Sequence, residues 1–153
     1  MVINPYLNFN GNTEEVFNFY KSIFGGDFPF VMRFNEMPQD AADGEGCVGE
    51  GIPENDANGL AHISLPVGQT MLMASDVPSN MPPVVAGTNV SLCLSVDSRA
   101  DADRIFNALS EGGTVQMPMQ DQFWGDYYGM LEDKFKIQWM VSFNEAQDGK
   151  NAQ

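Results

Sequence analysis

The sequence predicts an α+β fold in which a β-α-β-β-β module occurs twice along the chain. Each half has one segment with apolar residues at helical spacing, preceded by one strand-like segment and followed by three. Val16-Phe17-Asn18 before Gly25-Gly26 is similar to Ile105-Phe106-Asn107 before Gly112-Gly113, at an offset of 87 to 89 residues. This internal similarity indicates a duplication.

The first half begins with a predicted strand at residues 3–9, which ends at Asn10-Gly11. Asn12 is expected to cap the helix that follows, and Glu15 stands where a capping box needs its acid. Gly25-Gly26 ends this helix, because glycine accepts the left-handed conformation beyond a last turn. Three further strands are expected at residues 28–34, 60–67 and 69–75, the last two as a hairpin.

The second half repeats this order. Residues 89–96 alternate between apolar and polar side chains, as a half-buried strand does, and Ser98 begins a helix with Asp101 three residues later. Further strands are expected at residues 114–119, 126–131 and 136–143. We expect a single domain over residues 3–143, with modules at about 3–77 and 88–143, a proline-containing linker between them, and a polar tail at 144–153.

Composition excludes several classes of partner. The chain of 153 residues carries 21 acids against 7 bases, a net charge of −14, which repels nucleic acid and anionic membrane surfaces. It has no apolar run long enough for a transmembrane helix and no visible signal peptide. Cys47 and Cys93 lie in different surroundings, so we expect two free thiols and a cytoplasmic protein.

One long segment separates the second and third predicted strands. Residues 35–58 hold seven acids and no base, together with two prolines and four glycines. Asp40, Asp43 and Glu45 do not follow the alternating oxygen-ligand pattern of a calcium-binding loop. The segment is therefore predicted to be a solvated loop or a flap.

Motifs along the chain resemble one family in their order. The chain resembles PhnB-like proteins, a branch of the glyoxalase/bleomycin-resistance/dioxygenase superfamily, also called the vicinal oxygen chelate superfamily. The resemblance covers about residues 3 to 143. The matching segments are Pro5-Tyr6-Leu7-Asn8-Phe9, Phe19-Tyr20, Phe24-Gly25-Gly26, His62-Ile63-Ser64-Leu65, Leu72-Met73-Ala74-Ser75-Asp76, Phe123-Trp124-Gly125, Tyr128-Gly129 and Asp133-Lys134-Phe135.

The resemblance implies paired βαβββ modules around a glyoxalase-like cleft, and a homodimer. It does not imply one reaction, because the superfamily holds metal-dependent isomerases, epimerases, dioxygenases and thiol transferases beside metal-free drug-binding proteins. Some relatives carry a ubiquinone-pathway methyltransferase label. The chain has no Gly-rich nucleotide loop of the kind a methyl donor would need, so we do not adopt that label.

The resemblance also places the superfamily's metal-ligand positions on this chain. They fall at Asn4 or Pro5, at Met71 or Met73, at Ser91 and at Gln138. Zinc, iron and nickel prefer imidazole, carboxylate or thiolate ligands, and these side chains offer none of them. We therefore predict no metal cofactor.

His62 and Asp76 are the candidate catalytic residues. His62 is the only histidine, and alternation along its strand places it on the cleft side, away from the helix. If residues 60–67 and 69–76 pair as a hairpin, Asp76 comes close to His62 and fixes its tautomer. The alternatives are a structural histidine at a strand start and an aspartate that begins a turn.

Five further residues are candidates for ligand binding. Aromatic side chains can line an apolar pocket and orient a ligand through an indole N–H or a phenol, and methionine adapts to irregular shapes. The alternative for each is packing between strands. The candidates are Tyr6, Met73, Trp124, Tyr128 and Gln138.

The function that these observations predict is metal-free binding of a small apolar or aromatic molecule in the cleft between the modules. The alternative is a metal- or His-dependent lyase or isomerase, or a related dioxygenase-type enzyme. A weaker third possibility is an interaction module with an acidic surface.

Overall fold

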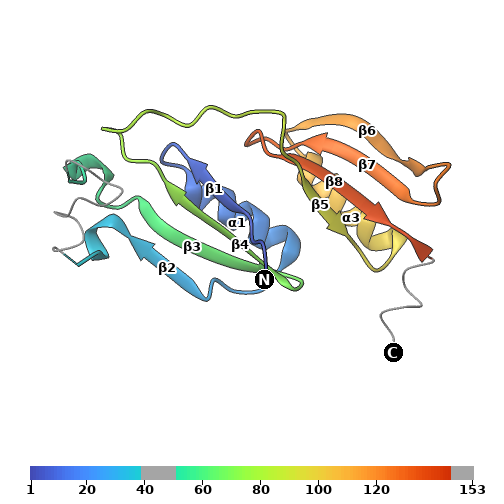
Figure 1. The fold of residues 1–153 in the computed structure, drawn as a ribbon, viewed down its shortest axis with the longest axis horizontal. Coiled ribbons are helices and arrows are strands. Elements are labelled where there is room, and N and C mark those ends of the chain that lie inside the picture. Colours follow the sequence, from blue (N-terminus) through green and yellow to red (C-terminus); the bar gives the residue numbers. More distant parts are fainter. Residues whose placement is uncertain (39–50, 146–153) are drawn as a thin grey trace. The chain divides into compact units, whose positions relative to one another are not determined.

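The first half of the chain forms a four-stranded mixed sheet with one helix on it. In the computed structural model, which describes residues 1–38 and 51–145, the chain divides into two units, Met1–Val85 and Ala86–Gln153 (Figure 1). In the first unit the strand order is β1-β4-β3-β2, with β1 parallel to β4 and the other pairs antiparallel. Its elements are β1 (Tyr6–Phe9), α1 (Thr13–Phe24), β2 (Phe30–Arg33), β3 (Leu60–Val67) and β4 (Thr70–Asp76), with short 3₁₀ helices at Phe34–Glu36 and Glu54–Asp56.

The second half repeats the arrangement with strand order β5-β8-β7-β6. Strand β5 is parallel to β8, and the remaining pairs are antiparallel. The β6–β7 register shifts on either side of Met117, so the ladder there is irregular. The elements are β5 (Leu92–Ser95), α3 (Arg99–Ser110), β6 (Thr114–Asp121), β7 (Tyr127–Glu132) and β8 (Gln138–Phe143).

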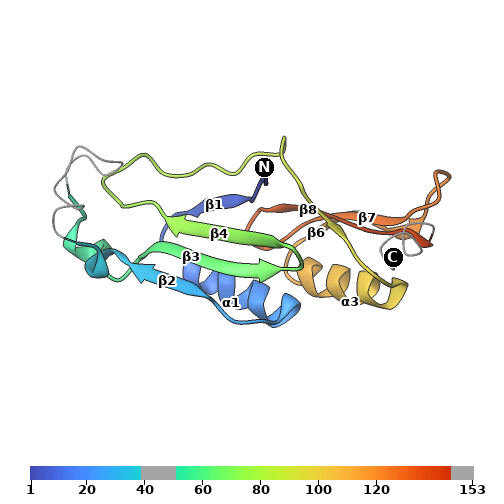
Figure 2. The same cartoon turned by 60° about the horizontal axis from the view of Figure 1, so that its bottom comes forward.

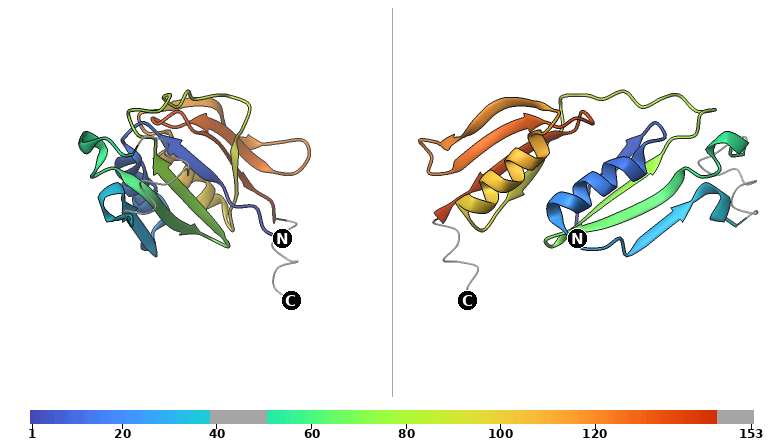
Figure 3. Two further views of the ribbon diagram at one scale, coloured as in Figure 1. Left: turned by 60° about the vertical axis from the view of Figure 1, so that its left-hand side comes forward. Right: turned by 180° about the vertical axis from the view of Figure 1, so that it is seen from behind.

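Each helix covers one face of its own sheet (Figures 2 and 3). In the first unit Val16, Phe17 and Tyr20 on α1 are fully buried, as are Ile63 and Leu65 on β3. In the second unit the buried residues of α3 are Ala102, Ile105, Phe106 and Leu109, and those of the sheet include Leu131, Trp139 and Val141. Because side chains alternate along a strand, the residues between these core positions point away from the helix.

The start of α1 differs from the sequence-based expectation. Asn12 makes no side-chain capping bond. The carboxylate of Asp76, at the end of β4, accepts hydrogen bonds from the Thr13 backbone N–H at 3.0 Å and from the Thr13 hydroxyl at 2.6 Å. The predicted capping box at Asn12 and Glu15 is therefore wrong, because a residue far along the chain takes the first free donor of the helix.

The start of α3 follows the prediction. The Ser98 hydroxyl accepts a hydrogen bond from the Asp101 backbone N–H at 3.0 Å. The predicted hairpin at Gly68 is also confirmed, since Val67 pairs with Thr70.

The predicted α+β class with two βαβββ modules is confirmed. The first strands of both modules are shorter than expected, starting at Tyr6 instead of residue 3 and at Leu92 instead of residue 89. Residues 39–50, which hold Cys47 and much of the acidic loop, and residues 146–153 of the polar tail lie outside the described residues. Within the described ranges, no helix is long and apolar enough to cross a membrane.

Candidate functional site

The face of the first sheet opposite α1 carries the first group of candidate residues. We call this surface the first open face. Strand pairing sets Tyr6 beside Met73, Met73 beside Ser64, and Ser64 beside Phe30. These four residues and His62, which pairs with Met32, define it.

His62 lies between two aromatic rings on the first open face. Its ring centroid is 5.5 Å from that of Tyr6 and 5.6 Å from that of Phe30, and Nδ1 lies 3.0 Å from the Tyr6 hydroxyl. Tyr6 and Phe30 keep 45% and 51% of their surface exposed. The structure thus brings together the predicted residues Tyr6, His62 and Met73. It also adds Phe30, whose strand was predicted but whose pairing partner was not.

Asp76 does not join this group. The β3–β4 register pairs Ile63 with Ala74. Because side chains alternate along each strand, Asp76 lies on the sheet face that α1 covers and His62 lies on the open face. The Asp76 carboxylate is buried and accepts from Thr13 and from the Leu60 backbone N–H at 2.8 Å. The expected pairing of Asp76 with His62 is wrong, and the partners of Asp76 are those of a structural carboxylate.

The corresponding surface of the second sheet is the second open face. Cys93 pairs with Met140, Met140 with Met130, and Tyr128 with Ser142. These five residues and Gln138 define it. The Tyr6–Met73 pair of the first sheet corresponds to the Cys93–Met140 pair of the second. Tyr6 and Cys93 are 87 residues apart, the same offset as between Gly25-Gly26 and Gly112-Gly113.

The same register makes His62 and Tyr128 equivalent. Tyr128 pairs with Ser142, two residues beyond Met140. The antiparallel register of the first sheet, continued by one residue from the Ile63–Ala74 pair, sets His62 opposite Ser75, two residues beyond Met73. The first module therefore carries an imidazole, and the second a phenol, at equivalent positions of their sheets.

Gln138 is buried on the second open face, and its amide is engaged at both ends. Its Oε1 accepts from Gln116 Nε2 at 2.7 Å, and its Nε2 donates to Glu132 Oε2 at 2.7 Å. Glu132 also accepts from the Lys136 ammonium at 2.8 Å, and the bonds from Lys136 and then Gln138 lower the pKa of Glu132. Hydrogen bonds thus hold the Gln138 side chain in a fixed position on the second open face.

Partial desolvation raises the pKa of two other groups on this face. Burial, and then the charge of Asp126, raise the pKa of the Cys93 thiol. Burial, and then Cys93, raise the pKa of the Tyr128 phenol. Both groups therefore stay protonated near neutral pH, and Tyr128 can donate a hydrogen bond to a ligand.

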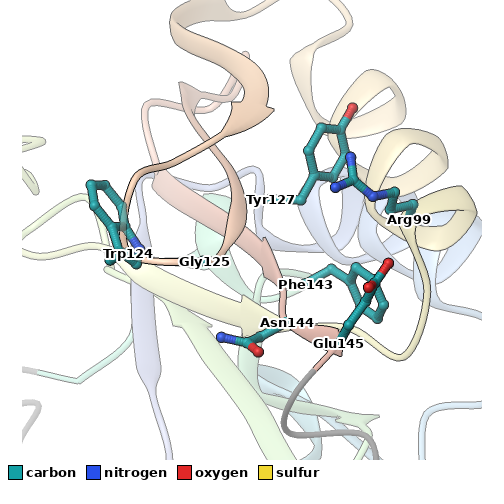
Figure 4. A pocket seen from close by; sticks show the side chains of 7 residues that line it. All are labelled: Arg99, Trp124, Gly125, Tyr127, Phe143, Asn144 and Glu145. Atoms are coloured by element: carbon teal, nitrogen blue, oxygen red, sulfur yellow. The ribbon is translucent and has the colours of Figure 1, made fainter.

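Trp124 lies in the turn between β6 and β7, half exposed, with its ring centroid 6.0 Å from that of Tyr128. Its indole N–H donates to Asp126 Oδ2 at 2.9 Å. The turn borders a hollow of about 260 Å³ within the second unit (Figure 4). The residues around this hollow are Arg99, Trp124, Gly125, Tyr127, Phe143, Asn144 and Glu145. Of these residues only Trp124 was a predicted site residue. Gly125 and Tyr127 lie beside it in the chain, while Arg99 and the residues from Phe143 onward come from two distant segments.

Two of the positions expected for metal ligands hold amide side chains that are already hydrogen-bonded within the protein. The Asn4 side-chain oxygen accepts from the Met71 backbone N–H at 3.2 Å, and both ends of the Gln138 amide are bonded. Among the described residues, no group of three or more His, Cys, Asp or Glu side chains is placed to hold a metal ion. These residues do not fit a divalent transition metal.

Two βαβββ modules, each with a helix on one sheet face and its other face uncovered by that helix, define a protein of glyoxalase fold. The chain belongs to the Glyoxalase/Bleomycin resistance protein/Dioxygenase superfamily, whose family model matches residues 2–141. The resemblance seen in the sequence is confirmed at this level.

Similar proteins cover nearly the whole chain. Protein YjdN of Escherichia coli (strain K12) is 28% identical over 148 residues, which cover 96% of this chain and 98% of YjdN. The crystal structure of protein PA1353 from Pseudomonas aeruginosa is 38% identical, with a TM-score of 0.78 over 94% of this chain and 98% of that one. A PhnB protein from Bacillus cereus, 22% identical, shares the fold with a TM-score of 0.70 over 94% and 99% of the two chains.

Proposed function

We propose that this protein binds a small apolar or aromatic molecule on the open faces of its sheets, without a metal cofactor. The observation that carries the proposal is the aromatic row Phe30–His62–Tyr6. Two rings that are about half exposed flank a single imidazole on a face that its own helix does not cover. A ligand that covers them gains roughly 25 cal/mol for each Å² of apolar surface removed from water.

Polar groups on the same face can orient such a ligand. When the Tyr6 hydroxyl donates to Nδ1 of His62, the neutral imidazole presents an N–H at Nε2. Within residues 1–38 and 51–85, Nε2 has no hydrogen-bond partner. Small-molecule sites commonly combine apolar walls with a few polar groups of this kind.

The second open face offers the same combination in a different form. Met130 and Met140 supply adaptable apolar surface, and Tyr128 supplies a protonated phenol. Gln138 belongs to this surface and Trp124 borders it, and Met73 takes the place of Met140 on the first open face. The proposal assigns ligand contacts to Tyr6, Phe30, His62, Met73 and Tyr128.

The alternative function is that of a lyase or isomerase that uses His62 as an acid–base group. The observation that favours it is the hydrogen bond between Tyr6 and His62, because a phenol that holds the imidazole can fix its tautomer. His62 would move a proton at Nε2, and Tyr6 would act as a positioning residue. A metal-dependent form of this chemistry has weaker support, since the donor set described above does not fit a transition metal.

The test compares two neighbouring residues of β2 that point to opposite faces. Phe30 lies on the first open face, and Val31, with 42% of its surface exposed, lies on the other. Indole and 1-naphthol serve as probes in calorimetric and NMR titrations of the wild type, Phe30→Ala, Val31→Ala and His62→Gln. We expect Phe30→Ala to weaken binding about tenfold, equivalent to about 1.4 kcal/mol, and Val31→Ala to leave it unchanged.

Equal losses in Phe30→Ala and Val31→Ala would contradict binding on the first open face. Turnover assays for lyase, isomerase and thiol-transfer reactions test the alternative. Turnover that disappears in His62→Ala and persists after removal of metals by chelation would favour the His-dependent enzyme. Metal retained near one equivalent after incubation with zinc, nickel, manganese or iron(II) and desalting would overturn the metal-free proposal.

A further inference from the structure

Apart from Trp124, the residues that line the hollow in the second unit take no part in the proposed function. It lies where α3 begins, where β8 ends and where the β6–β7 turn folds, and all of its walls belong to the same unit (Figure 4). Its volume of about 260 Å³ is just below the roughly 300–1,000 Å³ of common ligand sites, which suits a small ligand. We propose that this hollow binds a small organic cation, an ammonium or amidinium group on an apolar frame.

The charges around the hollow favour a cation. Among the described residues that line the hollow, Arg99 is the only base and Glu145 the only acid. Three more carboxylates are bonded directly to lining residues: Asp121 to Arg99, Asp103 to the Tyr127 hydroxyl at 2.6 Å, and Asp126 to the Trp124 indole N–H. Within residues 86–145, these groups set one positive charge against four negative charges.

The positive charge of Arg99 is already satisfied. Its guanidinium donates to Asp121, which raises the pKa of Arg99, and its central carbon lies 4.3 Å from the centroid of the Tyr127 ring. An anionic ligand would have to displace Asp121 and approach Glu145. A cation would instead meet the carboxylates of Asp103 and Asp126, which accept hydrogen bonds from neutral donors, and that of Glu145, whose charge also acts on Arg99.

Aromatic side chains make up the apolar part of the wall. Trp124, Tyr127 and Phe143 line the hollow, and the Arg99–Tyr127 contact shows that one of these rings already holds a cation against its face. Cation–π attraction is strongest for tryptophan, and half of the Trp124 surface is exposed. An ammonium group fits this combination of rings and carboxylates.

Hydrogen bonds hold the wall in place before a ligand arrives. Asp126 accepts from the Trp124 indole and from the Asn144 amide, so one carboxylate joins the turn to the segment after β8. The turn itself is closed by hydrogen bonds from Gln122 N to Asp126 O at 2.8 Å and from Gly125 N to Gln122 O at 3.0 Å. A fixed wall loses less conformational entropy on binding.

The test uses three probes of similar shape and different charge: benzylammonium, benzyl alcohol and benzoate. Trp124 fluorescence reports on the hollow, because the second tryptophan, Trp139, is 3% exposed and bonded to Asp133. A Trp124→Phe variant identifies the signal. We expect benzylammonium to bind about tenfold more tightly than benzyl alcohol, with benzoate weakest. Binding should weaken as ionic strength rises from about 0.01 M to about 0.15 M.

Three charge variants show whether a negative or a positive side chain at the hollow favours benzylammonium binding. Glu145→Gln should weaken benzylammonium binding about threefold to tenfold, and Arg99→Gln should strengthen it, because a repelling charge is removed. Glu111→Gln, at the other end of α3, removes the same charge as Glu145→Gln and should change nothing. Circular dichroism confirms that each variant is folded.

Three results would each overturn the proposal. Tighter binding of benzoate, lost in Arg99→Gln, would make the hollow an anion site. Equal affinities for benzylammonium and benzyl alcohol would make it an apolar hollow only. No saturable binding of benzylammonium up to about 10 mM would leave it without a ligand of this class. Phe30→Ala, which tests the first open face, should leave benzylammonium binding unchanged, so the two proposals fail separately.

Discussion

The hydroxyl group of Tyr6 lies 3.0 Å from Nδ1 of His62, and this contact joins β1 to β3 across the intervening strand β4. The two residues are 56 positions apart in the chain. Only the strand order of the sheet brings them together.

The first prediction concerns the tautomer of His62. A phenol that donates to Nδ1 leaves the proton of the neutral imidazole on Nε2. We therefore expect ¹⁵N NMR at alkaline pH to show mainly the Nε2–H form, with an unambiguous assignment because the chain has one histidine. Tyr6→Phe should raise the share of the Nδ1–H form. A dominant Nδ1–H form in the wild type that declines in Tyr6→Phe would show that the imidazole is the donor, and a tautomer ratio unchanged by Tyr6→Phe would show that the contact does not form.

The second prediction concerns the stability supplied by Asp76. Asp76→Ala leaves the backbone N–H groups of Thr13 and Leu60 without their partner in a buried place, so we expect a loss of about 2–4 kcal/mol in the free energy of unfolding. Asp56→Ala is the matched control. Asp56 accepts two hydrogen bonds from Ser79, where Asp76 accepts three, but its site is exposed, and the loss should be smaller. Urea unfolding measures both, and equal losses would argue against the buried cap.

The third prediction is a pH dependence. Arg33 forms two hydrogen bonds to Glu14, at 2.8 and 3.1 Å, and these lower the pKa of Glu14. A lowered folded-state pKa means that the pair stabilises the protein above the ordinary value of 4.5 and that this contribution is lost as pH falls through the lowered value. The pair is largely exposed, so Glu14→Gln should cost at most about 1 kcal/mol at pH 7.

The measurement for this pair is urea unfolding of wild type and Glu14→Gln from neutral to acidic pH. The difference between them should shrink as pH falls below 4.5. Glu15→Gln, next in the chain, removes the same charge outside the ion pair with Arg33 and is the control. A Glu14→Gln difference that stays constant with pH would mean that the ion pair does not contribute.

The fourth prediction concerns the reactivity of Cys93. Its raised pKa should place the half-maximal rate of alkylation by iodoacetamide at a higher pH in the folded protein than in guanidinium. A Cys47→Ser background isolates the Cys93 signal. Asp126→Asn should shift the midpoint down, since it removes the second cause of the raised pKa, while Glu111→Gln should not. A folded midpoint below the unfolded one would contradict the inferred environment.

Local patterns predicted much of the fold. The helical spacing of Val16, Phe17 and Tyr20, the alternation around His62 and the Ser98 cap each depend on neighbours within a few residues. Such signals are present in the sequence itself, which is why both modules and the facing of His62 could be predicted.

Long-range contacts could not be predicted in the same way. The partner of Asp76 follows from strand register, and a shift of one residue reverses the face on which a side chain lies. The expected Asp76–His62 pair failed for this reason, since the two residues have opposite parity in the β3–β4 hairpin. The hollow near Trp124 combines the start of α3 with the end of β8, which no local pattern links.

The two helix caps can form at different delays after their helices are synthesised. The Ser98 cap of α3 is complete three residues after it begins, so that helix can start as soon as its first turn leaves the ribosome. The cap of α1 must wait for Asp76, 63 residues after Thr13, a delay of ~3–13 s at common elongation rates. Asp76 is still made before Ser98, so α1 gains its cap first, but it waits 63 residues for it where α3 waits three. Until the β3–β4 hairpin has emerged, the apolar side of α1 lacks the sheet strands that bury it.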